Sequence, residues 1–340
     1  MRLRYPEHDI YHRSTQAAAP QSRVQRQKTL KDAIHCSGIG LHSGSKVSLT
    51  LEPGAADTGV VFLRTDMPAA KAAIRADWRS VVDTRLCTVI ANGLGAQVGT
   101  VEHLMAALAG CGVDNAVVRV NRAEVPAMDG SAEPFVFLIE CVGAVEQDAP
   151  RRAIQVLKSV NAGKDGHHAS LAPAASALLS FEIDFDNPAV ARQELSLTLN
   201  RDSFKNQISR ARTFGFLKDA EALRAQGLAR GASLDNAVVI NGENRILNEG
   251  GLRFDDEFVR HKVLDSVGDL YLAGGPICGH YRGVKAGHRL NNQLLRALFA
   301  DPRAWAYTTL DRVTGMAIGA PAALSAGSSA AAAPPLAATA

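Results

Sequence analysis

The alternation of apolar and polar positions predicts that the first half of the chain is rich in β-strands. Four short segments there are β-branched and bounded by Gly, Pro, Asp or Asn, a pattern typical of strands. They are residues 47–51, 59–62, 86–90 and 115–120. The second half begins with three strand-like segments, at residues 154–157, 177–183 and 194–199. Helical and glycine-rich segments follow them, so the order of elements recurs without a repeat of the sequence itself.

Two short amphipathic stretches predict helices. The first begins at Thr100, runs to about Ala109, and is closed by Gly110 and Gly112. Its apolar side comprises Val101, Leu104, Met105 and Leu108. The second covers residues 291–299 and buries Leu294, Leu295, Leu298 and Phe299. Between these helices, a cluster of turn-forming residues at 124–135 leads into an apolar segment that ends at Val142.

The longest helix is predicted to begin after Asp255 and to end at residues 274–276, a Gly-Gly-Pro sequence. Asp256 and Glu257 favour its first turn, because acidic side chains interact well with the positive end of the helix dipole. Its apolar side is formed by Val259, Val263, Leu264, Val267, Leu270 and Tyr271. The helix therefore has one face for packing and another for chemistry.

The polar face of the long helix carries candidate metal ligands. At ~100° per residue, His261, Asp265 and Asp269 lie on that face. His103, which follows Glu102 in the first turn of the shorter helix, is a third candidate. Two histidines and one carboxylate leave a fourth position of zinc open for water, as in catalytic sites. Spacing alone leaves a simpler interpretation open, because a His-x3-Asp pair is usually a solvated helix face.

Length and composition indicate a two-domain protein without a nucleic-acid partner. The 340 residues are 46% hydrophobic and 21% charged, enough to bury a substantial core. The net charge is +3, and residues 1–28 alone carry six basic and two acidic residues, which leaves about −1 for the rest. The five cysteines are scattered and never form a CxxC pair, which favours the reducing cytoplasm.

Both ends of the chain are expected to be disordered. Residues 1–28 contain no apolar run that could be the core of a signal peptide. From about Ala320 onward, small residues and proline dominate, a composition that cannot form a packed core. The last 20 residues hold three prolines and three serines, which argues against a membrane span.

Six separated strings closely resemble, in this order, the bacterial UDP-3-O-acyl-N-acetylglucosamine deacetylases of lipid A synthesis. They are GTVEHLMAALAGCGVDNAVV, EVPAMDGSAEPF, ISRARTFGF, GLARGASLDNAVV, LNEGGLRFDDEFVRHKVLDSVGDLYL and KAGHRLNNQLL. The resemblance covers residues 27–315. It implies a zinc amidase that removes the N-acetyl group of UDP-3-O-(3-hydroxyacyl)-N-acetylglucosamine and releases acetate. We expect one zinc ion per chain, with Fe²⁺ as a competitor, and a cytoplasmic monomer that does not span the membrane.

The resemblance also assigns roles to single residues. The metal ligands are His103, His261 and Asp265. Four further residues are implied in catalysis: Glu102 as general base, His288 as general acid, Asp269 as the hydrogen-bond partner of His288, and Thr213 as a donor to the carbonyl oxygen. The substrate-binding set comprises Lys262, Phe214, Leu217 and Gly231. The sequence alone leaves open that Lys262 is simply a solvent-facing lysine.

An insert at residues 214–248 is implied to form a hydrophobic passage for the acyl chain. The candidate wall residues are Leu217, Ala220, Leu223, Leu228, Ala229 and Val239. Ala220, Arg224 and Ala229 are small or polar for a wall, so the preferred acyl length stays open. Arg85, in the DTRLCT string, replaces what is commonly an apolar residue near the site.

The fold implied is α+β, with two β-α-α-β domains whose helices pack between the two sheets. The expected organisation is a disordered extension at 1–26, a first domain at 27–147, a linker at 148–152, a second domain at 153–315 and a disordered tail at 316–340. The site would lie between the domains.

The sequence leaves open two other functions and one further partner. The chain could bind the acylated UDP-sugar without turning it over, or act as a zinc amidohydrolase on another N-acetyl sugar. The last residues, 336–340, resemble the small apolar ends that ATP-dependent proteases grip, and an inert extension is the alternative.

Overall fold

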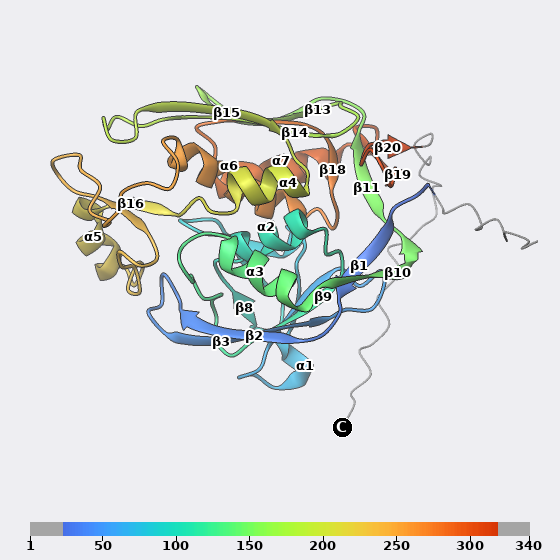
Figure 1. The fold of residues 1–340 in the computed structure, drawn as a ribbon, viewed down its shortest axis with the longest axis horizontal. Helices are drawn as coiled ribbons and strands as arrows, with labels where there is room; N and C mark the ends of the chain where they lie inside the picture. The colour runs from blue at the N-terminus through green and yellow to red at the C-terminus, as the bar shows by residue number, and fades with distance from the viewer. Residues whose placement is uncertain (1–22, 319–340) are drawn as a thin grey trace, which may run out of the picture.

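Two layers of β-sheet enclose a layer of helices (Figure 1). The computed structural model describes residues 23–318 of the chain. One sheet comes from the first half and the other from the second, and the longer helices of both halves lie between them. The structure thereby confirms the α+β sandwich predicted from the sequence.

The first half is built on a five-stranded sheet with the order β2-β3-β9-β4-β5. Its strands are β2 (Ile34–Ile39), β3 (Lys46–Pro53), β4 (Val60–Arg64), β5 (Ala73–Arg75) and β9 (Ala116–Val120). A smaller sheet contains β6 (Val81–Asp83), β7 (Val89–Ala91) and β8 (Gln97–Val98), and β1 (Arg26–Leu30) pairs with β10 (Ala144–Pro150). The helices are α1 (Ala69–Ala72), the 3-10 turn η1 (Trp78–Ser80), α2 (Glu102–Cys111) and α3 (Glu133–Val142).

The second half is built on an eight-stranded sheet in which β18 has a central place, because it pairs with β11, β13 and β14. The strands are β11 (Arg152–Val156), β12 (Val160–Lys164), β13 (His167–Ala172), β14 (Ala177–Asp184), β15 (Arg192–Thr198), β18 (Ile277–Val284), β19 (Trp305–Leu310) and β20 (Ala317–Ile318). The helices are α4 (Arg201–Ser203), the π-helical turn η2 (Phe204–Ile208), α6 (Glu257–Tyr271) and α7 (His288–Ala300).

An insert projects from the second half at one end of the molecule (Figure 1). It comprises the parallel strands β16 (Phe214–Phe216) and β17 (Val238–Ile240), with the 3-10 turn η3 (Leu217–Asp219) and α5 (Ala220–Ala225) between them. This is the β-α-β arrangement expected for residues 214–248.

Helices α2 and α6 pack against each other at the centre of the molecule. Nearly every residue of α2 is buried, as expected for a helix that is apolar on most of its surface. A Cβ atom placed on Gly268 of α6 would lie 1.9 Å from the carbonyl oxygen of Glu102, so only glycine permits this approach. The pair joins the two halves.

Three predicted elements differ from those observed. Residues 133–142 form α3, which the sequence indicated only as an apolar segment. The last helix begins at His288 rather than at residue 291. Of the strand predicted at 86–90, only residues 89–90 are extended, because Leu86 has φ of 65° and ends any regular pairing.

The ordered part of the chain extends past both predicted tail boundaries. Val24 forms a bridge with Asp311, and β20 pairs with β19. Between the halves, the chain passes from β10 to β11 at Arg151, within the range predicted as linker. Residues 1–22 and 319–340, including the C-terminal segment compared with protease signals, lie outside the described residues. None of the described helices has the length and apolarity needed to cross a membrane.

Candidate active site

Two histidines and an aspartate from opposite halves meet between α2 and α6. His103 lies in the first turn of α2, and His261 and Asp265 lie one turn apart on α6. Their donor atoms all lie within 4.8 Å of one another. The Nε2 atoms of His103 and His261 are 3.5 and 3.3 Å from Asp265 Oδ1. All three side chains are buried.

The donor set fits a divalent metal ion. Asp265 Oδ1 is buried without a hydrogen-bond partner among the described residues, which leaves it free to bind a cation. Two donor atoms ~2.1 Å from a tetrahedral ion lie ~3.4 Å apart, close to the separations observed. His261 Nδ1 contacts the carbonyl oxygen of Ala211 at 3.2 Å, so Nε2 faces the centre. Burial lowers the pKa of His261 to about 3, which keeps the ring neutral as a ligand must be.

The other oxygen of Asp265 is held by a lysine. Lys262 Nζ donates a hydrogen bond to Asp265 Oδ2 at 2.6 Å. Burial opposes ionisation, but the nearby His261 and Lys262 hold the pKa of Asp265 well below its usual range. Asp265 is therefore an ionised carboxylate with one oxygen fixed and the other aimed at the two histidines.

Glu102 is a buried carboxyl group beside this cluster. The backbone N–H of Thr88 donates to Glu102 Oε2 at 3.0 Å, and Glu102 Oε1 lies 3.9 Å from His288 Nε2. Burial raises the pKa of Glu102, although His288 and His103 partly counter the effect. A carboxyl group with a raised pKa is suited to accept and return a proton.

His288, the first residue of α7, faces Glu102 and is fixed by Asp269. His288 Nδ1 is 2.8 Å from Asp269 Oδ2. Asp269 also accepts hydrogen bonds from Asn291 Nδ2 at 2.8 Å and from the Thr88 hydroxyl at 2.6 Å. Burial lowers the pKa of His288, but the carboxylates Asp269 and Glu102 outweigh it and raise the pKa to about 9. His288 is thus a cation at neutral pH.

A cavity of about 680 Å³ connects this cluster to the insert. We call it the apolar cavity. Its polar end contains Glu102, His103, Thr213, His261, Lys262, Asp265 and His288. Its apolar walls include Leu41, Leu86, Phe185, Phe214, Phe216, Leu217, Leu223, Val239 and Leu247. The shape and chemistry suit a ligand with a polar group at the cluster and a long apolar group along the insert.

Comparison with known proteins assigns the family. The family model described as "LpxC: UDP-3-O-acyl N-acetylglycosamine deacetylase" matches residues 27–300. The chain belongs to this family. Proteins named UDP-3-O-acyl-N-acetylglucosamine deacetylase from Chromohalobacter salexigens and Acidithiobacillus ferrooxidans are 51% and 53% identical to it, over 84% and 83% of this chain and 94% and 92% of their own. The protein of that name from Vibrio parahaemolyticus is 50% identical over 85% of this chain and 95% of its own length.

Most residues singled out in the sequence by their likeness to this deacetylase family lie together in the structure. The cluster brings together His103, His261, Asp265, Glu102, His288 and Asp269. Phe214, Leu217, Lys262 and Thr213 line the apolar cavity. Gly231 does not line it. Its N–H donates to the carbonyl oxygen of Leu41, and a Cβ there would lie 2.2 Å from Gly40 O. Gly231 therefore allows close packing behind the cavity wall.

Most of the residues predicted for the wall of the acyl passage line the apolar cavity. Leu217, Ala220, Leu223, Ala229 and Val239 line the cavity, and so does Arg224. Leu228 is not among the lining residues. Arg85 is exposed and pairs with Asp83 at 2.8 Å, and it does not line the cavity, although its neighbour Leu86 does.

Thr213 is held at the polar end by two backbone hydrogen bonds. Its N–H donates to Gly130 O and its carbonyl accepts from Val238 N–H, both at 2.8 Å. Gly130 has φ of 84°, and a Cβ there would lie 2.1 Å from Asn236 O. Only glycine therefore lets this turn support the strand that begins after Thr213.

Three residues of the site were not identified from the sequence. Thr88 and Asn291 both bind Asp269, and they lie in the DTRLCT and GHRLNN strings. Neither residue is marked by a local pattern, because its bond to Asp269 is formed only by the tertiary fold. His42 lines the apolar cavity, and its buried Nε2 has no partner within residues 23–318. No spacing pattern distinguishes His42 from an ordinary loop histidine.

Proposed function

We propose that this chain hydrolyses the N-acetyl amide of UDP-3-O-(3-hydroxyacyl)-N-acetylglucosamine, giving the free amine and acetate in lipid A biosynthesis. The observation that carries the proposal is the apolar cavity, which joins a His-His-Asp cluster to a passage along the insert. The names of relatives about 50% identical over most of their length support the same substrate. The reaction would take place in the cytoplasm, with the chain acting as a monomer.

We further propose that the cluster holds one zinc ion through His103, His261 and Asp265, with Fe²⁺ as a competitor. The nitrogen and carboxylate donors are those that zinc prefers, and three protein ligands are typical of catalytic zinc. When bound, zinc supplies a Lewis acid and lowers the pKa of its water to ~7. We also propose that the chain forms two domains, at residues 27–147 and 153–315, and that the site lies between them.

Glu102 would accept the proton of the water that attacks the acetyl carbonyl. Its carboxyl group is buried beside the donor atoms of the cluster, and the Thr88 N–H holds one oxygen in place. The other oxygen faces His288, which leaves it free to take up a proton from an attacking water. General base catalysis of this kind is worth ~10² to 10⁴ in rate.

His288 would protonate the amine as it leaves. An amine expelled without a proton is a very poor leaving group, so amide hydrolysis requires an acid at this point. His288 is cationic, and Asp269 fixes its Nδ1 so that Nε2 faces the reacting centre. The Thr213 hydroxyl, at the same end of the cavity, would donate to the carbonyl oxygen as negative charge develops there.

The apolar walls would bind the acyl chain. Each buried methylene contributes ~0.8 kcal/mol, so a long chain supplies much of the binding free energy. Lys262 lies at the polar end, where its charge is engaged by Asp265 and also suits a substrate that carries a diphosphate.

Acetate release from the acylated UDP-sugar and from its non-acylated form tests the proposal. We expect turnover of the acylated substrate and a loss of at least ~10²-fold in kcat/KM without the acyl chain. Equal turnover of both would indicate an amidohydrolase for another N-acetyl sugar. Tight binding without acetate release would indicate a protein that only holds the substrate.

A further inference from the structure

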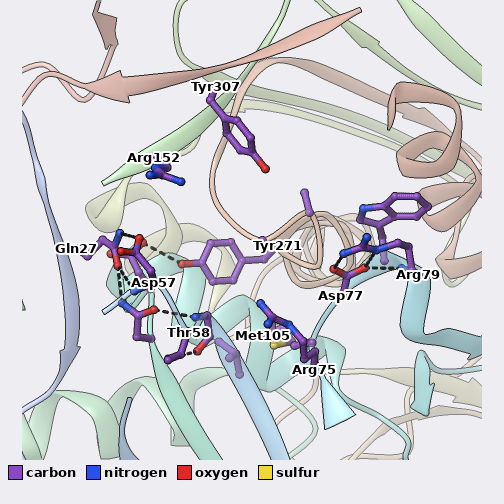
Figure 2. Close-up of a pocket in the computed structure, with 18 of the residues that line it drawn as sticks. Gln27, Asp57, Thr58, Arg75, Asp77, Arg79, Met105, Arg152, Tyr271 and Tyr307 are labelled. Carbon is purple, nitrogen blue, oxygen red and sulfur yellow. Dashed lines mark hydrogen bonds and ion pairs between the residues drawn. The ribbon is translucent and has the colours of Figure 1, made fainter. Parts of the chain in front are cut away.

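A second cavity, of about 470 Å³, lies between the two halves of the molecule (Figure 2). We call it the seam cavity. It shares no lining residue with the apolar cavity. The first half contributes residues 57–60 and 75–79, and the second half contributes Arg152, Tyr271 and Tyr307. Its volume is within the range of ~300 to 1,000 Å³ typical of small-molecule sites.

Two arginines of the seam cavity form no side-chain hydrogen bond or ion pair among the described residues. Arg79 is bonded to Asp77, with Nη2 and Oδ2 2.7 Å apart. Another lining carboxylate, Asp114, is bonded to Arg151, which does not line the cavity. In contrast, the side chains of Arg75 and Arg152 form no hydrogen bond or ion pair with any residue of the described range 23–318. They come from opposite halves, and Figure 2 shows them on either side of the Tyr271 ring. Two unpaired guanidinium groups facing one cavity favour a phosphate, which arginine binds through paired hydrogen bonds.

The remaining walls offer a hydroxyl acceptor and an aromatic surface. Asp57 uses one carboxylate oxygen to accept a hydrogen bond from the Gln27 amide at 2.8 Å, and its other oxygen is free among the described residues. The Trp305 and Tyr307 rings are 5.1 Å apart, and Tyr307 is 45% exposed. The buried Trp305 Nε1 also has no acceptor within that range. A planar ring with polar edges would suit this wall.

We propose that the seam cavity binds a nucleoside phosphate. The phosphate would accept hydrogen bonds from Arg75 and Arg152, the sugar hydroxyls would donate to Asp57, and the base would pack against Tyr307. Such a ligand contacts both halves at once. Because it binds the folded chain only, it stabilises the protein by mass action.

The seam cavity also contacts the helices that carry the cluster. Met105 of α2, Tyr271 at the end of α6 and Phe299 of α7 all line it. Helix α2 carries Glu102 and His103, α6 carries His261 and Asp265, and α7 carries His288. The ligand would therefore contact the three helices on which the active site depends, through residues that do not line the apolar cavity.

Titration calorimetry with adenosine monophosphate, on the full metal-loaded chain, tests the proposal. The key variant is Arg75→Gln/Arg152→Gln, and Arg282→Gln is the matched control, because Arg282 is exposed on β18 and lines neither cavity. We expect the double variant to bind at least ~10-fold more weakly and the control to bind as the unmodified chain does. At a hundredfold excess over Kd, the ligand should raise Tm of the unmodified chain by roughly 3 to 5 °C.

Further measurements separate the alternatives. The double variant should unfold at nearly the same temperature as the unmodified chain without ligand, because neither arginine has a hydrogen bond or ion pair to lose within residues 23–318. Tyr307→Ala should weaken the binding of adenosine monophosphate but not that of inorganic phosphate. Equal affinity of the unmodified chain for both ligands would refute the role of the ring. Absent binding, or binding unchanged in the double variant, would overturn the proposal. Turnover of the acylated UDP-sugar should persist in the double variant, so the proposed function stands or falls separately.

Discussion

Asp269 illustrates how single residues organise the site. One oxygen binds His288 and Asn291, and the other accepts the Thr88 hydroxyl. The carboxylate is buried, and the three partners together fix its position. Thr88 further supports the site through its N–H, which binds Glu102. A single residue outside the cluster thereby orients both the acid and the base.

Replacing Thr88 should impair catalysis without impairing binding. Thr88→Val removes the 2.6 Å bond to Asp269 while the backbone bond to Glu102 remains. We expect kcat to fall ~10- to 100-fold with little change in KM, as for other outer partners of catalytic groups. Thr88→Ser should restore most of the rate. Thr84→Val is the control, because Thr84 lies in the same loop and its side chain forms no hydrogen bond with the described residues. An increase in KM with an unchanged kcat would contradict the orienting role.

Removing a ligand of the cluster should remove the metal and the activity together. His261→Ala deletes one of three donors, so we expect the bound metal per chain to drop below a tenth and acetate release to fall at least ~10²-fold. Metal content by mass spectrometry and activity are measured on the same sample. His35→Ala, an exposed histidine on β2, should change neither. Full metal content in His261→Ala would show that His261 is no ligand.

At the level of elements, the contact of α2 with α6 depends on one glycine. Gly268→Ala would place a methyl group 1.9 Å from the Glu102 carbonyl oxygen. The helices must then separate, and we expect a loss of about 2 to 3 kcal/mol in the free energy of unfolding. Urea unfolding measures it, with Gly93→Ala as control, because a Cβ at Gly93 meets no atom within 4 Å. Equal stability of the two variants would refute the close contact.

Periodicity predicted the elements that carry the site, although not all their limits. Helix α6 has a clear apolar stripe with start and stop signals, so its extent and polar face could be predicted. Residues 133–142 are mostly apolar, which leaves helix and strand indistinguishable by period, and α3 was not foreseen. The strand at 86–90 was shortened by the positive φ of Leu86, for which the sequence gives no signal.

The meeting of His103 with His261 could be predicted only through resemblance to a family. Spacing placed Asp265 one turn from His261, because both lie on one helix. His103 is 158 positions away, and its approach depends on packing across the whole molecule. Thr88 and Asn291 contribute single polar bonds formed by the tertiary fold, so no local pattern marks them.

At the scale of the whole molecule, the two ends of the described chain are joined. Gln25 N–H donates to Leu310 O at 2.8 Å, and Arg312 N–H donates to Arg23 O at 2.7 Å. Asp311 completes the junction by pairing with Arg23 and accepting the N–H groups of Val313 and Thr314. Segments almost 290 positions apart in sequence are thereby held side by side.

Because of this junction, the stability of the fold should decrease at acidic pH. The hydrogen bond from Thr314 N–H, followed by Arg23, lowers the pKa of Asp311 well below its usual ~3.9. A depressed pKa contributes stability that is present above pH ~4 and lost as pH falls through the folded value. Asp311→Asn should therefore have a lower Tm than the unmodified chain at pH 7, with the difference shrinking toward pH 2. Asp165→Asn, on an exposed turn, is the control. A constant difference across this range would contradict the prediction.

The approach of α2 to α6 at Gly268 has a consequence for how this molecule can fail. The catalytic groups proposed above come from both halves, so neither half is active by itself. Because the helices touch through their backbones at Gly268, a small separation of the halves would already move these groups apart. A molecule whose halves have separated would keep most of its β-sheet structure and still lack hydrolytic activity. A compound that separates the two halves would therefore inactivate the protein without occupying the apolar cavity.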